Sequence, residues 1–217
     1  MLQGAARQYV MSTELWQDAQ IGQEHYTLMN LEHPHAEARV RSDMDAGVAV
    51  YYDRRWSITK VLAAWLLENV AVFRGKRVLV LGAGIGVETL VLARHGEHVW
   101  VNDLAPAALE LCVEQLKQNG LHNYTQLLGR YEALELPEVD LVVAGFLIYN
   151  KDTLAAMRTF LAHHHGDVLL VNERLKAFRS FLKTAPHDVL FDLDDGSVGI
   201  LIQGESNVRC RIGSLAK

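Results

Sequence analysis

The sequence predicts a doubly wound α/β fold: a mostly parallel, seven-stranded sheet with an antiparallel C-terminal hairpin and an N-terminal extension. From Gly75 onward, short apolar runs alternate with stretches of helical periodicity. The apolar runs are continuous, which is typical of strands that are covered on both faces of a sheet. The last two runs are separated only by the acidic turn DDGS, and this short connection favours a hairpin over another crossover.

Five strands and four helices are expected in the parallel part. The strands are predicted at residues 77–82, 98–103, 125–129, 139–145 and 167–173. The helices are predicted at residues 87–95, 106–119, 152–163 and 175–184. The closing hairpin pairs residues 187–193 with residues 198–204.

The region before Gly75 is predicted to hold one amphipathic helix and a strand pair. Apolar residues recur at helical spacing from Ile58 to Leu66, directly after Ser57. Further upstream, we interpret residues 25–34 and 47–56 as two strands joined by a loop. We therefore divide the chain into an N-terminal extension, residues 1–56, and a main domain, residues 57–217.

Charge and composition limit the partners. The chain has 217 residues, a net charge of −5 and a pI of about 6.0, so it lacks the basic footprint of a nucleic-acid-binding protein. No apolar run reaches the roughly 20 residues that a membrane helix needs, and we expect no membrane association.

The two cysteines, Cys112 and Cys210, lie far apart, and the first twenty residues lack a secretory signal pattern. We expect a cytoplasmic protein.

The stretch VLVLGAGIGVETL is the clearest functional motif. It begins as a buried strand, passes through Gly82, Gly84 and Gly86, and continues as a helix. Gly82 allows a tight turn, Gly84 lets a ligand approach the backbone, and Gly86 permits close packing where the helix begins. The free N–H groups at that helix start attract anionic or polar ligand groups.

The spacing of the glycines distinguishes between cofactors. Dinucleotide-binding turns favour G-x-G-x-x-G, which would place the third glycine at position 87, where this chain has Val87. A nicotinamide dehydrogenase is therefore disfavoured. The amino-acid end of a smaller nucleoside cofactor makes no such demand.

Asp103 lies at the end of the next predicted strand, about twenty residues further on. A carboxylate at this place can accept hydrogen bonds from both ribose hydroxyls, and Leu104 offers an apolar surface to an adenine. The alternative is that Asp103 is a turn or capping residue before Pro106. Together with the glycine turn, Asp103 points to a nucleoside with a carboxylate-bearing tail.

Three stretches, VLVLGAGIG, VNDLAP and VDLVVAG, have the order and spacing of the first, second and fourth strand motifs of one enzyme family. Over residues 58–203 the chain resembles the class I, seven-β-strand S-adenosylmethionine-dependent methyltransferases. The resemblance implies a Rossmann-like domain with S-adenosyl-L-methionine as cofactor. With the features above, we expect these residues to bind it: Trp56, Gly82, Ala83, Gly84, Gly86, Asp103, Leu104, Gly129, Arg130 and Gly145.

A narrower resemblance is to the protein-lysine methyltransferases that include the enzymes for electron-transfer flavoprotein and elongation factors. Trp56 before the helix and the stretch NERLKAFRSF fit this group. The group carries an acid and, three residues later, an aromatic residue just after the fourth strand. Tyr149 fills the aromatic position, but Phe146 stands where the acid is expected. If the acceptor is a lysine, another acid is needed, and Glu173 is the candidate by topology.

The resemblance implies a protein substrate, with a lysine amine as the acceptor. A lysine has a pKa of about 10.4 and accepts a methyl group only when neutral, and a desolvated slot of Phe146, Tyr149 and Trp56 would lower that value. Two alternatives remain: a small-molecule acceptor, or a non-catalytic binding module, which Phe146 suggests. The histidine clusters at residues 33–35 and 163–165 have no ligand partners at recognisable spacing, and we expect no metal.

Overall fold

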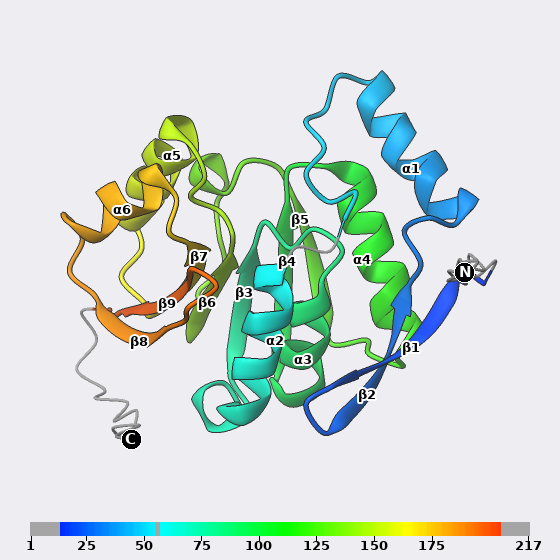
Figure 1. Ribbon diagram of the computed structural model, residues 1–217, viewed down its shortest axis with the longest axis horizontal. Helices are drawn as coiled ribbons and strands as arrows, with labels where there is room; N and C mark the ends of the chain where they lie inside the picture. Colours follow the sequence, from blue (N-terminus) through cyan, green and yellow to red (C-terminus); the bar gives the residue numbers. More distant parts are fainter. Residues whose placement is uncertain (1–13, 55–56, 205–217) are drawn as a thin grey trace, which may run out of the picture.

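The protein is described by a computed structural model that covers residues 14–54 and 57–204. A seven-stranded sheet has the strand order β5-β4-β3-β6-β7-β9-β8, and a separate pair is formed by β1 and β2. From β5 to β7 the neighbouring strands are parallel, whereas β9 runs antiparallel to both β7 and β8. Figure 1 shows helices on both sides of this sheet. The predicted fold class is confirmed.

The elements of the sheet and its helices have the following bounds. The large sheet consists of β3 (Arg77–Leu81), β4 (His98–Asp103), β5 (Tyr124–Leu128), β6 (Leu141–Gly145), β7 (Val168–Glu173), β8 (Asp188–Asp192) and β9 (Ser197–Ile202). The helices are α1 (Pro34–Asp45), α2 (Ser57–Glu68), α3 (Val87–His95), α4 (Pro106–Gln118), α5 (Lys151–Leu161) and α6 (Lys176–Leu182), with short single-turn helices η1 (Val70–Val72) and η2 (Tyr131–Ala133).

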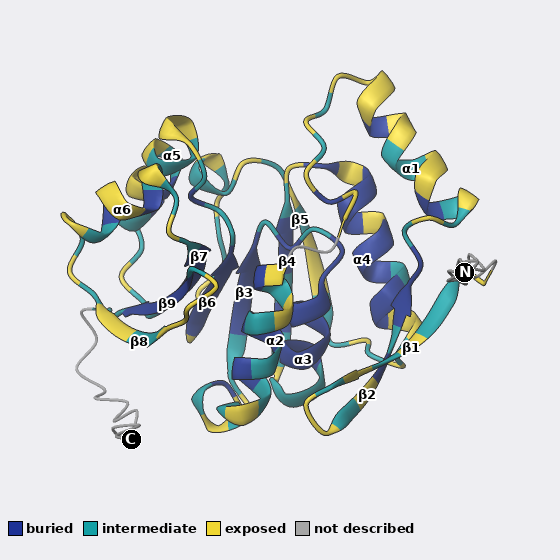
Figure 2. Cartoon of the chain, viewed as in Figure 1, coloured by how far each residue is buried: buried dark blue, intermediate teal, exposed yellow. Residues whose placement is uncertain are grey.

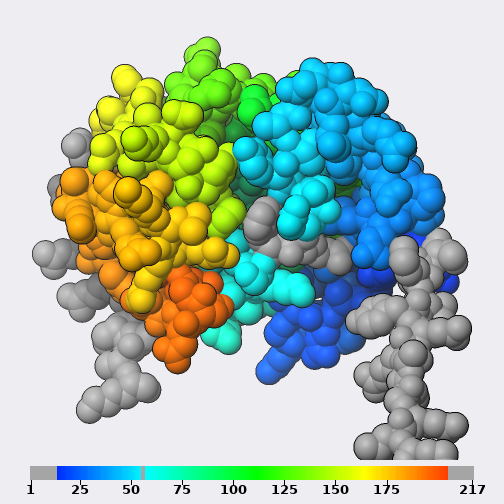
Figure 3. Space-filling model, turned by 45° about the horizontal axis from the view of Figure 1, so that its top comes forward, coloured from blue at the N-terminus to red at the C-terminus, as the bar shows by residue number. Residues whose placement is uncertain are grey.

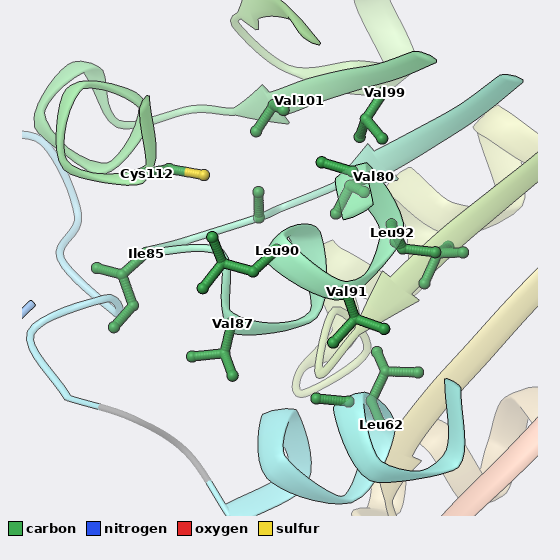
Figure 4. Packing of buried hydrophobic residues seen from close by; sticks show 14 of the residues in the cluster. Leu62, Val80, Ile85, Val87, Leu90, Val91, Leu92, Val99, Val101 and Cys112 are labelled. Carbon is green, nitrogen blue, oxygen red and sulfur yellow. The ribbon is translucent and has the colours of Figure 1, made fainter. Parts of the chain in front are cut away.

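The central strand β3 is buried on both faces, as its unbroken apolar sequence requires. Val78 and Val80 point into a core that they share with α2, α3 and α4. Leu79 and Leu81 point the other way, into a second core with residues from α5 and α6. Figure 2 shows the buried strands between helices that are exposed on their outer sides, and Figure 4 shows the first core from close by.

The N-terminal strand pair differs from the prediction. β1 (Trp16–Ile21) pairs with β2 (Glu24–Met29), whereas residues 34–45 form a helix and residues 47–54 form no strand. The turn between the two strands includes Gly22 at φ +58°, a conformation that favours glycine. β1 has the sequence WQDAQI, in which two adjacent polar residues break the alternation and few side chains are large and apolar, so its strand pattern is weak in the sequence.

The N-terminal segment packs against the main domain through buried polar contacts. The backbone N–H of Met29 donates to Gln115 Oε1 at 2.8 Å, and Gln115 Nε2 donates to the carbonyl oxygen of Ile85 at 2.7 Å. Asp43 of α1 accepts hydrogen bonds from the Tyr52 hydroxyl at 2.6 Å and from the Ala107 backbone at 3.1 Å. These contacts place residues 48–54 beside the carboxyl ends of the strands.

Within residues 14–54 and 57–204, we find no helix with the length and apolarity that crossing a bilayer requires. In the same residues, no group of three His, Cys, Asp or Glu side chains is arranged to hold a metal ion.

Candidate active site

A cavity of about 610 Å³ lies at the carboxyl ends of β3, β4 and β6. Open α/β sheets bind ligands at this edge. In Figure 3 a recess separates the yellow-green surface around the start of α5 from the cyan surface of the N-terminal segment. All the described residues that we predicted to contact cofactor line this cavity: Gly82, Ala83, Gly84, Gly86, Asp103, Leu104, Gly129, Arg130 and Gly145. Trp56 lies outside the described residues.

The glycine turn has the backbone geometry that its sequence predicts. Gly82, Gly84 and Gly86 have φ values of +60°, +53° and +72°, all in the region that side chains disfavour. A Cβ on Gly82 would lie 2.4 Å from Leu147 Cδ2, and a Cβ on Gly86 would lie 2.4 Å from Cys112 Sγ. The turn therefore fits tightly between the segment after β6 and helix α4.

Asp103 holds the glycine turn in place. Its Oδ2 accepts a hydrogen bond from the Gly84 backbone at 2.8 Å, and its Oδ1 accepts one from the Ala105 backbone at 2.9 Å. Burial raises the pKa of this carboxyl, and the backbone N–H groups partly offset that effect. The N-cap of α4 is Ala105 rather than Asp103. Each carboxylate oxygen can still accept a further hydrogen bond, and Leu104 beside it is 48% exposed.

One wall of the cavity comes from the N-terminal extension, from which the sequence had indicated only Trp56. Ala49, Tyr51, Tyr52 and Arg54 all line it. Tyr52 lies against the glycine turn, because a Cβ on Gly84 would be 3.6 Å from Tyr52 Cβ. The buried hydrogen bond from Tyr52 to Asp43 fixes this wall to α1.

The mouth of the cavity is aromatic. The rings of Phe146 and Tyr149 are stacked with centroids 6.1 Å apart, and the centroid of the Tyr51 ring lies 5.2 Å from that of Tyr149. Phe146 has φ +55°, and it is the one non-glycine residue with positive φ in the described part of the chain. Backbone strain of this kind is often found at functional sites. The Tyr149 backbone donates to Thr153 Oγ1 at 3.1 Å, which attaches the segment to the start of α5.

The structure does not bring Glu173 to the cavity. Glu173 ends β7 and pairs with Ser197 of β9, and it is absent from the cavity lining. The sheet order explains this, because β6 separates β7 from β3. The acids that do line the cavity are Glu88, Asp103, Glu132 and Asp152.

Glu88 is the acid that sequence reasoning missed. It is 2% exposed and is the second residue of α3, whose first seven residues are all buried. Burial raises its pKa to about 7. Its Oε2 has no hydrogen-bond partner among the residues that the structure describes. The one signal in the sequence was an acid at the start of a helix, in a stretch where most other residues are apolar.

Glu88 should make the ligand-free protein less stable as the pH rises. Its pKa is raised from 4.5 to about 7 in the folded chain, so its contribution to stability is fully present below pH 4.5 and is lost as the pH rises through about 7. The loss amounts to about 3 kcal/mol. Urea unfolding of the wild type and of Glu88→Gln at several pH values measures it. The variant should gain stability relative to the wild type between about pH 5 and 8, and a constant difference would contradict this assignment.

Comparison with known proteins agrees with this geometry. A family model described as a methyltransferase domain matches residues 78–165. Electron transfer flavoprotein beta subunit lysine methyltransferase of Mus musculus is 30% identical, over 57% of this chain and 51% of its own length. Protein N-lysine methyltransferase METTL21A of Danio rerio is 30% identical, over 65% of this chain and 69% of its own length. The chain spans about half the length of the flavoprotein methyltransferases that it matches.

A solved structure extends the likeness to most of the fold. The 16S rRNA methyltransferase RsmC of T. thermophilus, in complex with AdoMet and guanosine, has a TM-score of 0.62 at 20% identity. The match covers 88% of this chain and 51% of that chain. The sheet order, the glycine turn with its acid, and the relatives agree: the chain belongs to the class I, seven-β-strand methyltransferase family.

Proposed function

We propose that the protein is an S-adenosylmethionine-dependent methyltransferase that acts on a side chain of another protein, with lysine as the acceptor. The observation that carries this is the position of Asp103 beside Gly84 in an open cavity at the strand ends. A side-chain carboxylate next to a glycine turn is the arrangement that holds the ribose of a nucleoside cofactor, and Val87 in place of a third, later glycine disfavours a dinucleotide. We further propose the cytoplasm as its location and residues 57–217 as its main domain.

The cavity suits the proposed cofactor in size and chemistry. Its volume of about 610 Å³ lies within the roughly 300–1,000 Å³ that is typical of small-molecule sites. Asp103 offers acceptor capacity for ribose hydroxyls, and the exposed side chain of Leu104 offers an apolar surface for a base. The N–H groups at the start of α3 suit the carboxylate of the donor's tail, and the buried carboxyl of Glu88 suits its ammonium.

The protein's part in the reaction is to position two reactants and exclude water. When bound, S-adenosyl-L-methionine supplies an activated methyl group on a sulfonium. Correct placement of the acceptor contributes roughly 7–11 kcal/mol to lowering such a barrier. The rings of Tyr51, Phe146 and Tyr149 give the mouth apolar walls, and an apolar wall favours the neutral, reactive form of an amine.

The choice of a protein acceptor rests on the relatives, whose names describe lysine methyltransferases. Phe146 departs from the acid of that group, so this chain needs another route to hold an amine. Asp152 lines the same mouth and is exposed, which makes it a better candidate than Glu173 for this contact.

Transfer of radiolabel from S-adenosylmethionine into a cell lysate tests the proposal. We expect label on protease-sensitive material, with methyl-lysine identified by mass spectrometry, and no label with Asp103→Ala. Label confined to small molecules would favour the alternative acceptor. Absence of label, with donor binding demonstrated by calorimetry, would leave only a binding module.

Tyr149 gives a finer test of the acceptor slot. Tyr149→Ala should lower kcat/KM by roughly tenfold or more because it removes a ring that stacks on Phe146 and contacts Tyr51. Tyr149→Phe keeps the ring and should retain most of the activity. If the two variants are equally impaired, the hydroxyl rather than the apolar wall is what matters.

A further inference from the structure

We propose that Glu88 binds the α-ammonium group at the amino-acid end of the methyl donor, and that it releases its proton to solvent as the donor binds. This inference rests on the proposed function, because it concerns the same cavity. It goes further by assigning the donor's cationic group to one residue and by linking donor binding to a proton.

The first argument is an unsatisfied buried carboxyl. In the described part of the chain, three buried side-chain atoms lack a hydrogen-bond partner: Glu88 Oε2, Thr89 Oγ1 and His164 Nε2. Of these residues only Glu88 lines the cavity. The carboxyl accepts a hydrogen bond from its own backbone N–H, but a buried carboxyl oxygen without a partner is still costly, so a ligand that supplies the partner is the natural explanation for its retention.

The second argument is where the carboxyl lies. Glu88 lies two residues after Gly86 of the glycine turn, in the first turn of α3. A Cβ on Gly145 would be 3.6 Å from Glu88 Oε1 and 3.3 Å from Leu62 Cδ2. The carboxyl is thus placed between the turn and the end of β6, the two segments against which the tail of the donor is expected.

The third argument is charge. The pKa of Glu88 is raised by burial, and only its own backbone N–H opposes this effect; among the described residues no basic group does so. On the neighbouring elements, Leu62 of α2 and Gly145 of β6 carry no charge, while Asp103 at the end of β4 and the Cys112 thiol of α4 can only add negative charge. Indeed, Glu88 and Asp103 both raise the pKa of Cys112. A cation is therefore the partner that this position lacks.

Three cationic groups enter a methyltransferase of this kind: the sulfonium and the ammonium of the donor, and the ammonium of a lysine acceptor. The sulfonium has no N–H or O–H to donate to Glu88 Oε2, which leaves the two ammonium groups. Burial distinguishes them. An acceptor side chain arrives from solvent through the mouth at Tyr51 and Tyr149, where Tyr51 is 54% exposed. Glu88 is 2% exposed and lies behind the glycine turn. The donor's tail is expected along that turn. The ammonium of the donor therefore lies closer to Glu88 than the ammonium of the acceptor does.

Proton release follows from this placement. In the ligand-free protein the pKa of Glu88 is about 7, so close to half of the molecules carry the proton at pH 7. An adjacent ammonium favours the charged carboxylate and lowers that pKa. The carboxyl O–H bond breaks, the proton passes to the buffer, and the carboxylate pairs with an ammonium that keeps its own protons.

The test is calorimetric titration at pH 7 in two buffers with different ionisation enthalpies. The probes are S-adenosylhomocysteine, which has the amino-acid tail, and 5′-methylthioadenosine, which lacks it. With the wild type, we expect release of about half a proton for the first ligand and none for the second. Glu88→Gln should bind S-adenosylhomocysteine at least tenfold more weakly, release no proton, and bind 5′-methylthioadenosine as the wild type does.

Glu114→Gln is the matched control, because Glu114 is a partly buried glutamate that pairs with His35 outside the cavity. It should keep the proton release of the wild type. Equal weakening of both ligands by Glu88→Gln would mean that Glu88 is structural. Unchanged affinity for S-adenosylhomocysteine, with or without a raised KM for the acceptor, would overturn the assignment to the donor.

The two wild-type titrations keep the inference testable even if Glu88→Gln does not fold. If the wild type binds both ligands and releases the same number of protons with each, the Glu88 assignment fails and the proposed function stands. If it binds neither ligand, the proposed function itself fails.

Discussion

Replacing Asp103 with alanine should weaken binding of S-adenosylmethionine by at least 100-fold. The carboxylate is expected to accept two charge-assisted hydrogen bonds from the ribose, each worth roughly 1.5–3 kcal/mol. The substitution also removes the acceptor that holds the Gly84 backbone at 2.8 Å. Calorimetric titration of the folded variant with S-adenosylmethionine measures the loss.

The chain offers a matched control at the opposite end of β3. Asp140 accepts a hydrogen bond from the Arg77 backbone at 2.8 Å and pairs with the Arg77 guanidinium, remote from the cavity. Asp140→Ala therefore loses a similar backbone contact without loss of donor affinity. If Asp103→Ala is folded and binds as the wild type does, the ribose assignment is incorrect.

Gly86→Ala should produce a large loss of stability. The new Cβ would lie 2.4 Å from Cys112 Sγ in a buried position, and such overpacking costs roughly 1–3 kcal/mol. The residue also has φ +72°, which adds roughly 1–2 kcal/mol for a side chain. For a chain of this size we expect the Tm to fall by roughly 5–15 °C, measured by thermal unfolding.

Gly120→Ala separates strain from crowding. Gly120 has φ +70°, but a Cβ there meets nothing within 4 Å, so this variant should lose only the conformational part. Cys112→Ala in the Gly86→Ala background removes the Sγ and should restore part of the lost stability. Equal losses for the two glycine variants would show that packing against Cys112 is unimportant.

Much of the fold could be predicted because its strands are buried on both faces. Continuous apolar runs such as β3 leave no ambiguity about a covered sheet, and the short acidic turn before Ser197 indicated the hairpin of β8 and β9. The glycine turn and Asp103 could be found because the backbone geometry and the charge require particular residue types at a fixed spacing.

The N-terminal region could not be predicted because its contacts are non-local. Helix α1 has few buried apolar residues, and it is anchored by Asp43, whose partners Tyr52 and Ala107 lie elsewhere in the chain. The same contact brings Tyr51 and Tyr52 to the cavity. No local pattern carries that information.

The acids of the site show the same limit. Glu173 was expected from its place at a strand end, but pairing with β9 and the sheet order keep it away from the cavity. Glu88 was missed because a helical run such as VETLVLARH does not show which of its faces meets a cavity. Its importance appears only when burial and the lack of a partner are known.

A crystal structure with S-adenosylhomocysteine is the most direct test of the account. We expect the ligand in the cavity at the ends of β3, β4 and β6, with both ribose hydroxyls in hydrogen-bond distance of the Asp103 carboxylate and the amino-acid tail along Gly82–Gly86. A ligand bound elsewhere, or a ribose that does not contact Asp103, would contradict it.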